Sequence, residues 1–238
     1  MSNSKYADFF IRDNCPGDGP VIEEVYIQQC YRLAILQRSH RSGPQFVVDI
    51  GAHIGSFTRH YHELNPQARI ASVEACPENM QLLEMNVGSI SRVIHAACTY
   101  EEDFVLANAV FDGGEYTGGS TVTTSWDSNE FPPNSHFCDV RDIPAITLEQ
   151  IMSQSGEEGI DILKLDCEGS EISILRETTS LDRVGLIVGE FHERDDWEPL
   201  RMSVAAGWPY SIQNGGGSSR SGIFHLRNPN WNGCWSEQ

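Results

Sequence analysis

The chain has 238 residues, of which 39% are hydrophobic and 9% aromatic; these values suit one soluble globular domain with a full core. Its formal net charge is -18 at pH 7, and so acidic a chain repels phosphate backbones, so we expect no nucleic-acid partner. The 7 cysteines include no C-x-x-C pair, which favours free thiols in a reducing compartment. Without a secretory signal or a membrane-length apolar run, we expect a cytoplasmic protein with no membrane partner.

The predicted elements begin with an N-terminal preface and then alternate between strand and helix. Apolar residues at helical spacing over 21–37 predict a helix that either packs on the core or caps a ligand cleft. Further along we predict strands over 46–50, 69–73, 93–97, 160–165, 185–191, 210–213 and 223–226, and helices over 55–63, 77–87, 147–153 and 171–176. This alternation is typical of an α/β fold in which a mostly parallel sheet carries helices on both faces.

One stretch, about 104–137, interrupts the alternation. It is rich in Gly, Thr, Ser, Asn and Pro, which predicts a β-hairpin or long loop inserted between the third strand and the next helix; a disordered excursion is the alternative. We therefore expect an N-terminal helical extension or cap over 1–45 and one domain over 46–238 that contains this insert.

The segment F-V-V-D-I-G-A-H-I-G-S-F-T, residues 46–58, combines a strand, a glycine turn and a helix start. Glycines permit a tight turn and a close approach of the backbone to a ligand, and a nucleotide-like cofactor binds at such a strand end. The G-x-x-x-G spacing departs from the G-x-G-x-x-G of dinucleotide sites and resembles the first motif of S-adenosylmethionine (SAM) methyltransferases. The candidate cofactor-binding residues in this segment are Asp49, Gly51, Ala52, His53, Gly55 and Ser56.

Three more positions extend the predicted cofactor site. Glu74 ends the second strand, about twenty residues after the turn, where an acidic side chain accepts the ribose hydroxyls of a nucleotide. Ala97 ends the third predicted strand, where an adenine ring would lie. Asp49 either accepts hydrogen bonds from N–H groups of the turn or balances the charge of the sulfonium-bearing amino acid.

A second cluster lies in K-L-D-C-E-G-S-E, residues 164–171, and G-E-F-H-E, residues 189–193. Asp166 and Glu168 follow one strand end, and Glu190 and His192 project to the same side of the next. Because ligands bind beyond the carboxyl ends of such strands, the four side chains are expected to converge there. Carboxylates with one imidazole also suit Mg²⁺ or Mn²⁺; a divalent metal stays open but is not favoured, and we assign no metal ligand.

These motifs together resemble the FkbM family of methyltransferases, over about residues 46–193. The segments D-I-G-A-H-I-G-S-F-T, V-E-A-C-P-E-N, A-I-T-L-E-Q-I, I-D-I-L-K-L-D-C-E-G-S-E-I-S-I-L and G-E-F-H carry the resemblance. It implies a SAM-dependent enzyme with the seven-stranded, Rossmann-like class I fold, acting on hydroxyls of sugars or secondary metabolites, or in some members on peptide side-chain amides. His53 departs from the usual Asn of the family at that place in the turn.

The mechanistic hypothesis is O-methylation, with His192 as general base and Asp166 and Glu168 as ligands of the acceptor. Asp166 is also placed among the cofactor-binding residues. The alternative role for His192 is structural, in which it only holds its loop in place. The alternatives are an N-methyltransferase of a peptide side chain, an NAD-dependent oxidoreductase and a non-catalytic SAM-fold binding module. The expected partner is a small-molecule, glycan or peptide acceptor, and the oligomeric state stays open.

Overall fold

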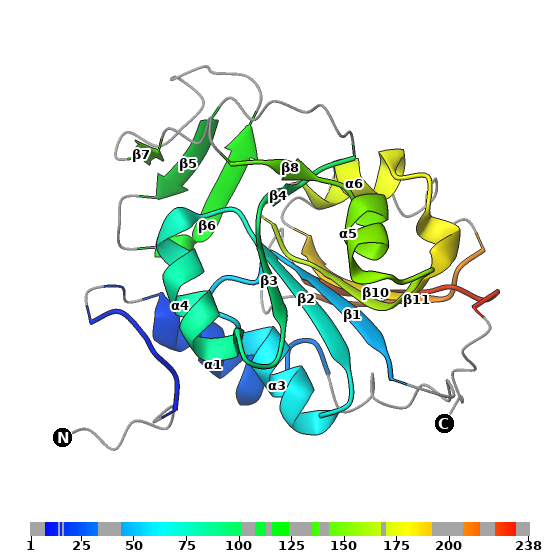
Figure 1. Cartoon of the computed structure of the whole chain (residues 1–238), viewed down its shortest axis with the longest axis horizontal. Coiled ribbons are helices and arrows are strands. Elements are labelled where there is room, and N and C mark those ends of the chain that lie inside the picture. The colour runs from blue at the N-terminus through cyan, green and yellow to red at the C-terminus, as the bar shows by residue number, and fades with distance from the viewer. Residues whose placement is uncertain are drawn as a thin grey trace.

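The computed structural model describes residues 8–13, 15, 17–32, 44–100, 108–112, 116–123, 135–138, 143–167, 170–191, 207–214 and 222–231; within 108–138 and 210–214 it describes the backbone alone. A seven-stranded sheet crosses the molecule in the order β11-β12-β10-β9-β1-β2-β3 (Figure 1). Its strands are β1 (Phe46–Ile50), β2 (Arg69–Glu74), β3 (Arg92–His95), β9 (Ile160–Leu165), β10 (Val184–Phe191), β11 (Tyr210–Asn214) and β12 (Gly222–Arg227).

The sheet is parallel from β3 to β10, and β12 runs antiparallel to both of its neighbours. This confirms the expected seven-stranded, mostly parallel sheet. The order places β1 at the centre, between β2 and β9. The chain reverses its direction of travel across the sheet there, and ligands of open α/β sheets bind at such a switch point.

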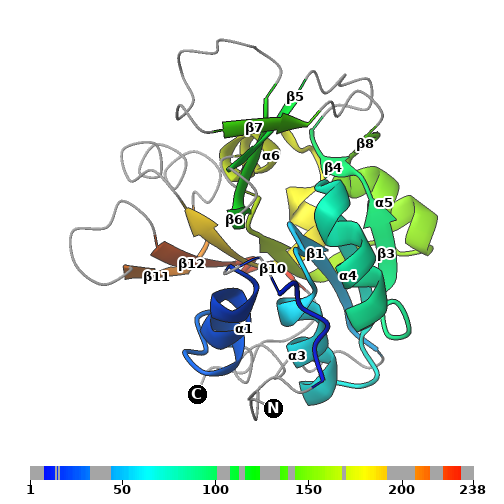
Figure 2. The ribbon, with the colours of Figure 1, turned by 90° about the vertical axis from the view of Figure 1, so that its left-hand side faces the viewer.

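Helices cover both faces of the sheet (Figures 1 and 2). One face carries α1 (Asp18–Tyr26), α3 (Ser56–Leu64) and α4 (Pro77–Val87); the other carries α5 (Leu148–Ser155) and α6 (Glu171–Glu177), and the 3-10 turn η1 (Leu181–Arg183) precedes β10. Successive strand residues point to opposite faces: Val47 packs in the cluster with Phe57 of α3, and Val48 in the cluster with Ile151 of α5. No helix in the described part of the chain has the length and apolar character needed to cross a membrane.

The third predicted strand, 93–97, is wrong at its end. β3 stops at His95, and a separate short strand, β4 (Ala97–Cys98), pairs in parallel with β8 (Ala145–Ile146) outside the main sheet. The main-chain N–H of Ala96 still bonds to the carbonyl of Glu74, but that of Ala97 bonds to the carbonyl of Pro144. The chain therefore leaves the sheet between these two residues, which the sequence pattern of 93–97 does not reveal.

The predicted helix over 21–37 is also wrong in its bounds. The helix α1 begins at Asp18 and ends at Tyr26, and Gln29 adopts a left-handed conformation with φ 54°. The Gln29 side-chain amide donates to the carbonyl of Tyr26 at 2.8 Å, which satisfies a group left open by the helix end. Val25 packs in the same core cluster as α3, so α1 covers the sheet; residues 33–37 lie outside the described residues.

The insert contains a three-stranded antiparallel sheet in the order β6-β5-β7. Its strands are β5 (Asn108–Asp112), β6 (Tyr116–Thr123) and β7 (Ser135–Cys138). The pairing of β5 with β6 agrees with the predicted hairpin, and β7 adds a third strand that the sequence pattern did not indicate. Figure 1 shows this small sheet beyond α4, away from the chain termini.

Candidate cofactor and acceptor site

The glycine turn after β1 is fixed by the protein's own packing. Gly51 has φ 71°, and a Cβ there would lie 1.8 Å from the carbonyl oxygen of Asp166. Gly55 has φ 92°, and a Cβ there would lie 2.7 Å from a methyl group of Val87 on α4. The predicted tight turn is present, and the end of β9 and the side of α4 lie close against its two glycines; a close approach to a ligand stays a prediction.

The N–H groups of the turn bond to the end of β2. Gly51 and Ala52 both donate to the carbonyl of Val73 at 3.0 Å, and His53 donates to Oε2 of Glu74 at 2.8 Å. The hypothesis that Asp49 accepts hydrogen bonds from the turn is therefore wrong for these three donors. The turn and the end of β2 form one rigid unit.

Glu74 lies beside this turn at the carboxyl end of β2, where the ribose ligand was predicted. It is 7% exposed. Its Oε1 accepts from Cys76 N at 2.8 Å and from the Asn79 amide at 3.3 Å, while Oε2 accepts from the turn. Burial raises the pKa of Glu74, although these donors and Lys164 oppose the change. Each carboxylate oxygen has about two acceptor positions, so Oε2 retains one that suits a ribose hydroxyl.

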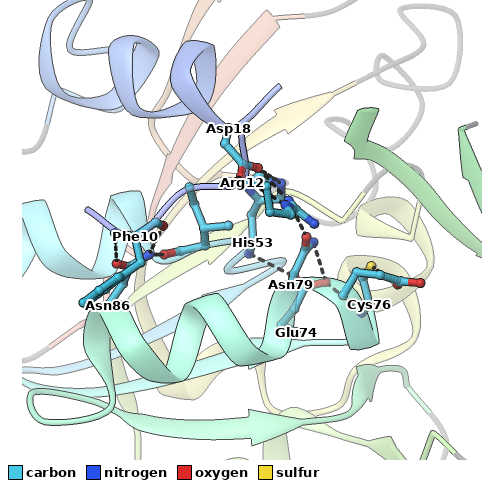
Figure 3. Close-up of polar contacts among 10 residues, drawn as sticks. Phe10, Arg12, Asp18, His53, Glu74, Cys76, Asn79 and Asn86 are labelled. Atoms are coloured by element: carbon cyan, nitrogen blue, oxygen red, sulfur yellow. Dashed lines mark hydrogen bonds and ion pairs between the residues drawn. The ribbon is translucent and has the colours of Figure 1, made fainter. Parts of the chain in front are cut away.

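His53 points away from β2 and toward the N-terminal part of the chain. Its φ is 50°, a left-handed conformation in which Asn is several-fold enriched; this accounts physically for the Asn of the family. Its Nε2 lies 3.9 Å from Oδ1 of Asp18 on α1 (Figure 3). Burial lowers the pKa of His53 to about 4, although Asp18 acts in the opposite direction. The imidazole is therefore neutral at pH 7.

The segment before α1 is tied to the same turn (Figure 3). The Arg12 guanidinium donates to both carboxylate oxygens of Asp18, at 3.0 and 2.6 Å, and to the Asn79 side-chain oxygen at 3.1 Å. Asn79 in turn donates to Glu74. Arg12 thus reaches the predicted ribose ligand through one side chain. No pattern of spacing in the sequence pointed to this residue.

Lys164 joins the ends of β1 and β9. It is 3% exposed, and its Nζ donates to the carbonyls of Ile50 and Gly51 at 3.2 and 2.6 Å. The same atom lies 3.2 Å from Asp49 Oδ1 and 3.6 Å from Asp166 Oδ2. Burial alone would lower the pKa of Lys164, but the two carboxylates outweigh it and raise the pKa. The sequence analysis missed this role, although Lys164 is one of only two lysines, Lys5 being the other.

Asp49 is fully buried and takes part in this charge pair. Its Oδ2 accepts from the Thr58 hydroxyl at 2.7 Å, and that hydroxyl contacts the Ser72 hydroxyl of β2 at 2.7 Å. Ser56, another predicted cofactor residue, is the first residue of α3 and is 3% exposed. These contacts link β1, β2 and α3 beneath the turn.

The region where β9 and β10 end, next to α1, is acidic. Burial, then the charges of Asp166 and Glu24, raise the pKa of Glu190 on β10 to about 8; burial and the charge of Asp166 also raise the pKa of Glu24 on α1. Asp166 and Glu190 were expected to converge; their neighbours Leu165 and Gly189 are paired in register, and the charge of Asp166 is near enough to raise the pKa of Glu190. Glu168 and His192 lie outside the described residues, so their predicted place stays a prediction. Glu24 was missed because helix α1 carries it to the site from outside the motifs.

Two further predictions concern Ala97 and a metal. Ala97 is 5% exposed and lies in β4, and its contact with an adenine ring stays a prediction. Among the described residues, no three His, Cys, Asp or Glu side chains are grouped so that they hold a metal ion.

The sheet order, the reversed β12, the glycine turn after β1 and the acidic residue that ends β2 together define a class I, SAM-dependent methyltransferase. A family model described as the methyltransferase FkbM domain matches residues 49–205. The chain belongs to this family, as the sequence motifs indicated.

Individual relatives are distant. The AMB antimetabolite synthetase AmbE of Pseudomonas aeruginosa is 24% identical over 184 residues, which cover 63% of this chain and 8% of that protein. Methyltransferase 1 of Beauveria bassiana is 25% identical over 167 residues, 65% of this chain and 64% of that protein. The chain thus spans less than two thirds of both relatives. In fold, it is similar to the N-terminal domain of human METTL16 in complex with SAH, with a TM-score of 0.45, 12% identity and coverage of 88% and 71% of the two chains.

Proposed function

We propose that this methyltransferase moves the methyl group of SAM to a hydroxyl of a small molecule, a sugar or a secondary metabolite. The observation that supports proton removal at the site is Glu190, a carboxyl group near the end of β10 whose pKa is raised to about 8 by burial and by the charge of Asp166; the choice of oxygen over nitrogen rests on the hydroxyl acceptors that the family resemblance implies. A hydroxyl must lose its proton when it is methylated, and a general base serves best when its pKa is near the working pH.

The proposed cofactor site is the turn and its surroundings. Glu74 holds the ribose hydroxyls, because its carboxylate is fixed by three donors at the carboxyl end of β2. The backbone of the turn lies against the amino-acid part. The whole proposed set is Asp49, Gly51, Ala52, His53, Gly55, Ser56, Glu74, Ala97 and Asp166. When bound, SAM supplies an activated methyl group on a sulfonium.

The chain's own task is to orient the acceptor and to receive its proton. We assign Asp166 and Glu168 to binding the acceptor hydroxyl, and either His192 or Glu190 to accepting the proton. As the oxygen–carbon bond forms and the methyl group leaves sulfur, the proton of the hydroxyl passes to that base. Alignment contributes several kcal/mol, and the base typically adds about 10²–10⁴-fold in rate.

N-methylation of a peptide side chain, in the maturation of a natural product, is the second candidate. A related segment lies within a protein named an antimetabolite synthetase, which favours secondary metabolism for both candidates. The acidic surroundings of Glu190 favour an acceptor that gives up a proton, and both oxygen and amide nitrogen acceptors do so.

Residues 1–45 act as an extension that completes the site, and residues 46–238 form the methyltransferase domain. Arg12 supports the first part, since it reaches Asn79 on α4. Five described cysteines are in no disulfide, which supports a reducing, cytoplasmic location: Cys15, Cys30, Cys76, Cys98 and Cys167.

The test is a screen of acceptors with deuterium-labelled SAM. Sugars, hydroxylated metabolites and Asn-containing peptides are incubated with the full chain, and label transfer is followed by mass spectrometry and located by NMR. Label on oxygen supports the proposal, whereas label only on nitrogen establishes the second candidate instead. In parallel, SAM is expected to raise the melting temperature and NAD to leave it unchanged; the reverse result would overturn the proposal.

Variants then assign the base. Glu190→Gln and His192→Asn are compared with Glu158→Gln, whose side chain is exposed between α5 and β9. The loss of one base is expected to lower kcat by about 10²–10⁴-fold. If neither variant lowers kcat below that of Glu158→Gln, the assignment of the proton acceptor is wrong.

A further inference from the structure

Tyr31 lies upstream of the segment that matches the family, 49–205, yet it reaches the candidate site. It is 4% exposed and packs in the core cluster with Val25 and Phe57. Its ring meets Phe57 edge-on, with centroids 5.5 Å apart, and its carbonyl lies 3.3 Å from Nε2 of His225 on β12. Phe57 therefore packs against the ring, and His225 contacts the backbone of the same residue.

The hydroxyl of Tyr31 donates to Oδ2 of Asp166 at 2.7 Å. Lys164 approaches the same oxygen at 3.6 Å, and its Nζ lies 5.9 Å from the centre of the Tyr31 ring. Burial and the charge of Asp166 raise the pKa of Tyr31 well above its usual value. The phenol therefore stays protonated and acts as a donor. Two positive or donating groups on one oxygen fix the rotation of the carboxylate.

We propose that Tyr31 is a positioning residue for methyl transfer, whose hydroxyl orients Asp166 toward the acceptor and keeps it ionised. The inference rests on the proposed function, in which Asp166 binds the acceptor. A hydrogen bond to the charged form of a carboxylate favours that form. A carboxylate that kept a proton would lose one of its acceptor positions for the incoming hydroxyl.

Several titratable groups surround Asp166 and also influence whether its carboxyl group is ionised. They are Lys164 and Cys167 at the end of β9, Glu24 on α1, Cys30 beside Tyr31, Glu190 on β10 and His53 in the turn. Lys164 acts in the same direction as Tyr31, and the carboxyl groups of Glu24 and Glu190 act against it. The nearby carboxylates already favour the protonated form of Asp166. Removing the Tyr31 hydroxyl is therefore expected to increase the protonated fraction further.

Tyr31→Phe removes the hydroxyl and keeps the ring. The matched control is Tyr61→Phe, since Tyr61 lies in the same core cluster, is 0% exposed and donates to the Gln45 side chain at 2.5 Å, away from the strand ends. The full chain is labelled with ¹³C at the aspartate carboxyl groups and saturated with SAH, and the signal of Asp166 is assigned by its loss in Asp166→Asn.

Tyr31→Phe is expected to raise the pKa of Asp166 by about 1 unit, because the charged carboxylate loses a hydrogen-bond donor. Tyr61→Phe is expected to leave it unchanged. With the acceptor found by the screen, Tyr31→Phe is further expected to lower kcat/KM for that acceptor, and Tyr61→Phe to leave it unchanged. An unchanged Asp166 titration in Tyr31→Phe overturns the inference.

A different outcome would overturn the proposed function alone. If Asp166→Asn keeps full turnover, Asp166 does not bind the acceptor, even if Tyr31 sets its titration. Should Tyr31→Phe fail to fold, the same contact is tested from the other side. In Asp166→Asn, ultraviolet titration is expected to show one tyrosine that ionises at lower pH than in the unmodified chain, and no such change overturns the inference.

Discussion

Lys164 Nζ lies 3.2 Å from Asp49 Oδ1, and both side chains are almost completely buried where β1 and β9 end. The pair joins the central two strands of the sheet directly beneath the glycine turn. Lys164→Met is expected to lower the free energy of unfolding by about 3–5 kcal/mol, because it leaves the Asp49 carboxylate buried without its counter-charge. Urea denaturation measures this loss.

A double-mutant cycle separates the pair from general disruption. Adding Asp49→Asn to Lys164→Met removes the unpaired charge, so the double variant is expected to lose less than the sum of the single losses. Strict additivity would show that the two groups do not interact.

His53 occupies a left-handed position, a conformation in which both His and Asn are enriched. His53→Asn is expected to change the free energy of unfolding by less than about 0.5 kcal/mol, and His53→Val to lower it by about 1–2 kcal/mol. Differential scanning calorimetry at pH 7 compares the two. Equal losses in both variants would show that the histidine ring, and not the backbone conformation, determines the cost.

We also expect His53 to make the stability of the fold depend on pH. The pKa of His53 is lowered to about 4 by burial, whereas it is near 6.5 in an unfolded chain. Between these values the unfolded state binds more protons, so the stability due to this residue is present above pH 6.5 and is lost as the pH falls toward 4. His53→Asn is therefore expected to lose less stability than the unmodified chain over this window, measured by urea denaturation at several pH values. If the stability of His53→Asn and that of the unmodified chain changed equally with pH, His53 would not be the cause of the pH dependence.

For Glu190 we expect the opposite pH dependence, in which stability falls as the pH rises. Its pKa is raised to about 8, so between about pH 4.5 and 8 the folded state holds a proton that the unfolded state has released. Stability then falls as the pH rises through this range. Glu190→Gln, which cannot ionise, is expected to be more stable than the unmodified chain at pH 8, and the difference is expected to vanish near pH 4.5. A difference that does not depend on pH would rule out ionisation of Glu190 as its cause.

We expect Arg12 to affect the affinity for the cofactor indirectly, through Asn79 and Glu74. Arg12→Met removes the donor that holds Asn79, which itself bonds to Glu74. The affinity for SAH is expected to fall about fivefold to tenfold, or about 1–1.4 kcal/mol, by isothermal titration calorimetry. The control, Arg92→Met, removes an exposed side chain of β3 that donates to Gln154. Equal affinities in both variants would show that the Arg12 contact does not reach the ribose ligand.

Most of the fold was predictable because its hydrophobic patterns are local. Strands such as 46–50 and 160–165 are mostly apolar, with Asp49, Asp161 and Lys164 as their charged residues, and their observed bounds agree with the prediction. Where the predicted bounds of an element were wrong, tertiary contacts determined where it ends. The third strand ends early because Ala97 pairs with the chain near Pro144, and α1 ends early because the chain turns back at Gln29. Neither partner is visible in a sequence window.

The candidate site was predictable where its residues follow strand ends. Asp49, Glu74 and Asp166 lie at such ends, and the order of the parallel strands brings them to one edge of the sheet. Arg12 and Tyr31 were not predictable, because neither belongs to a motif. They reach the site only because the segment around α1 folds over the sheet.

The structure of the complex with SAH tests the central claim most directly. The account predicts that the ribose hydroxyls lie within hydrogen-bond distance, about 2.6–3.2 Å, of the Glu74 carboxylate, and that the sulfur faces Asp166 and Glu190. A ribose bound elsewhere, with Glu74 bonded only to His53, Cys76 and Asn79, would contradict it.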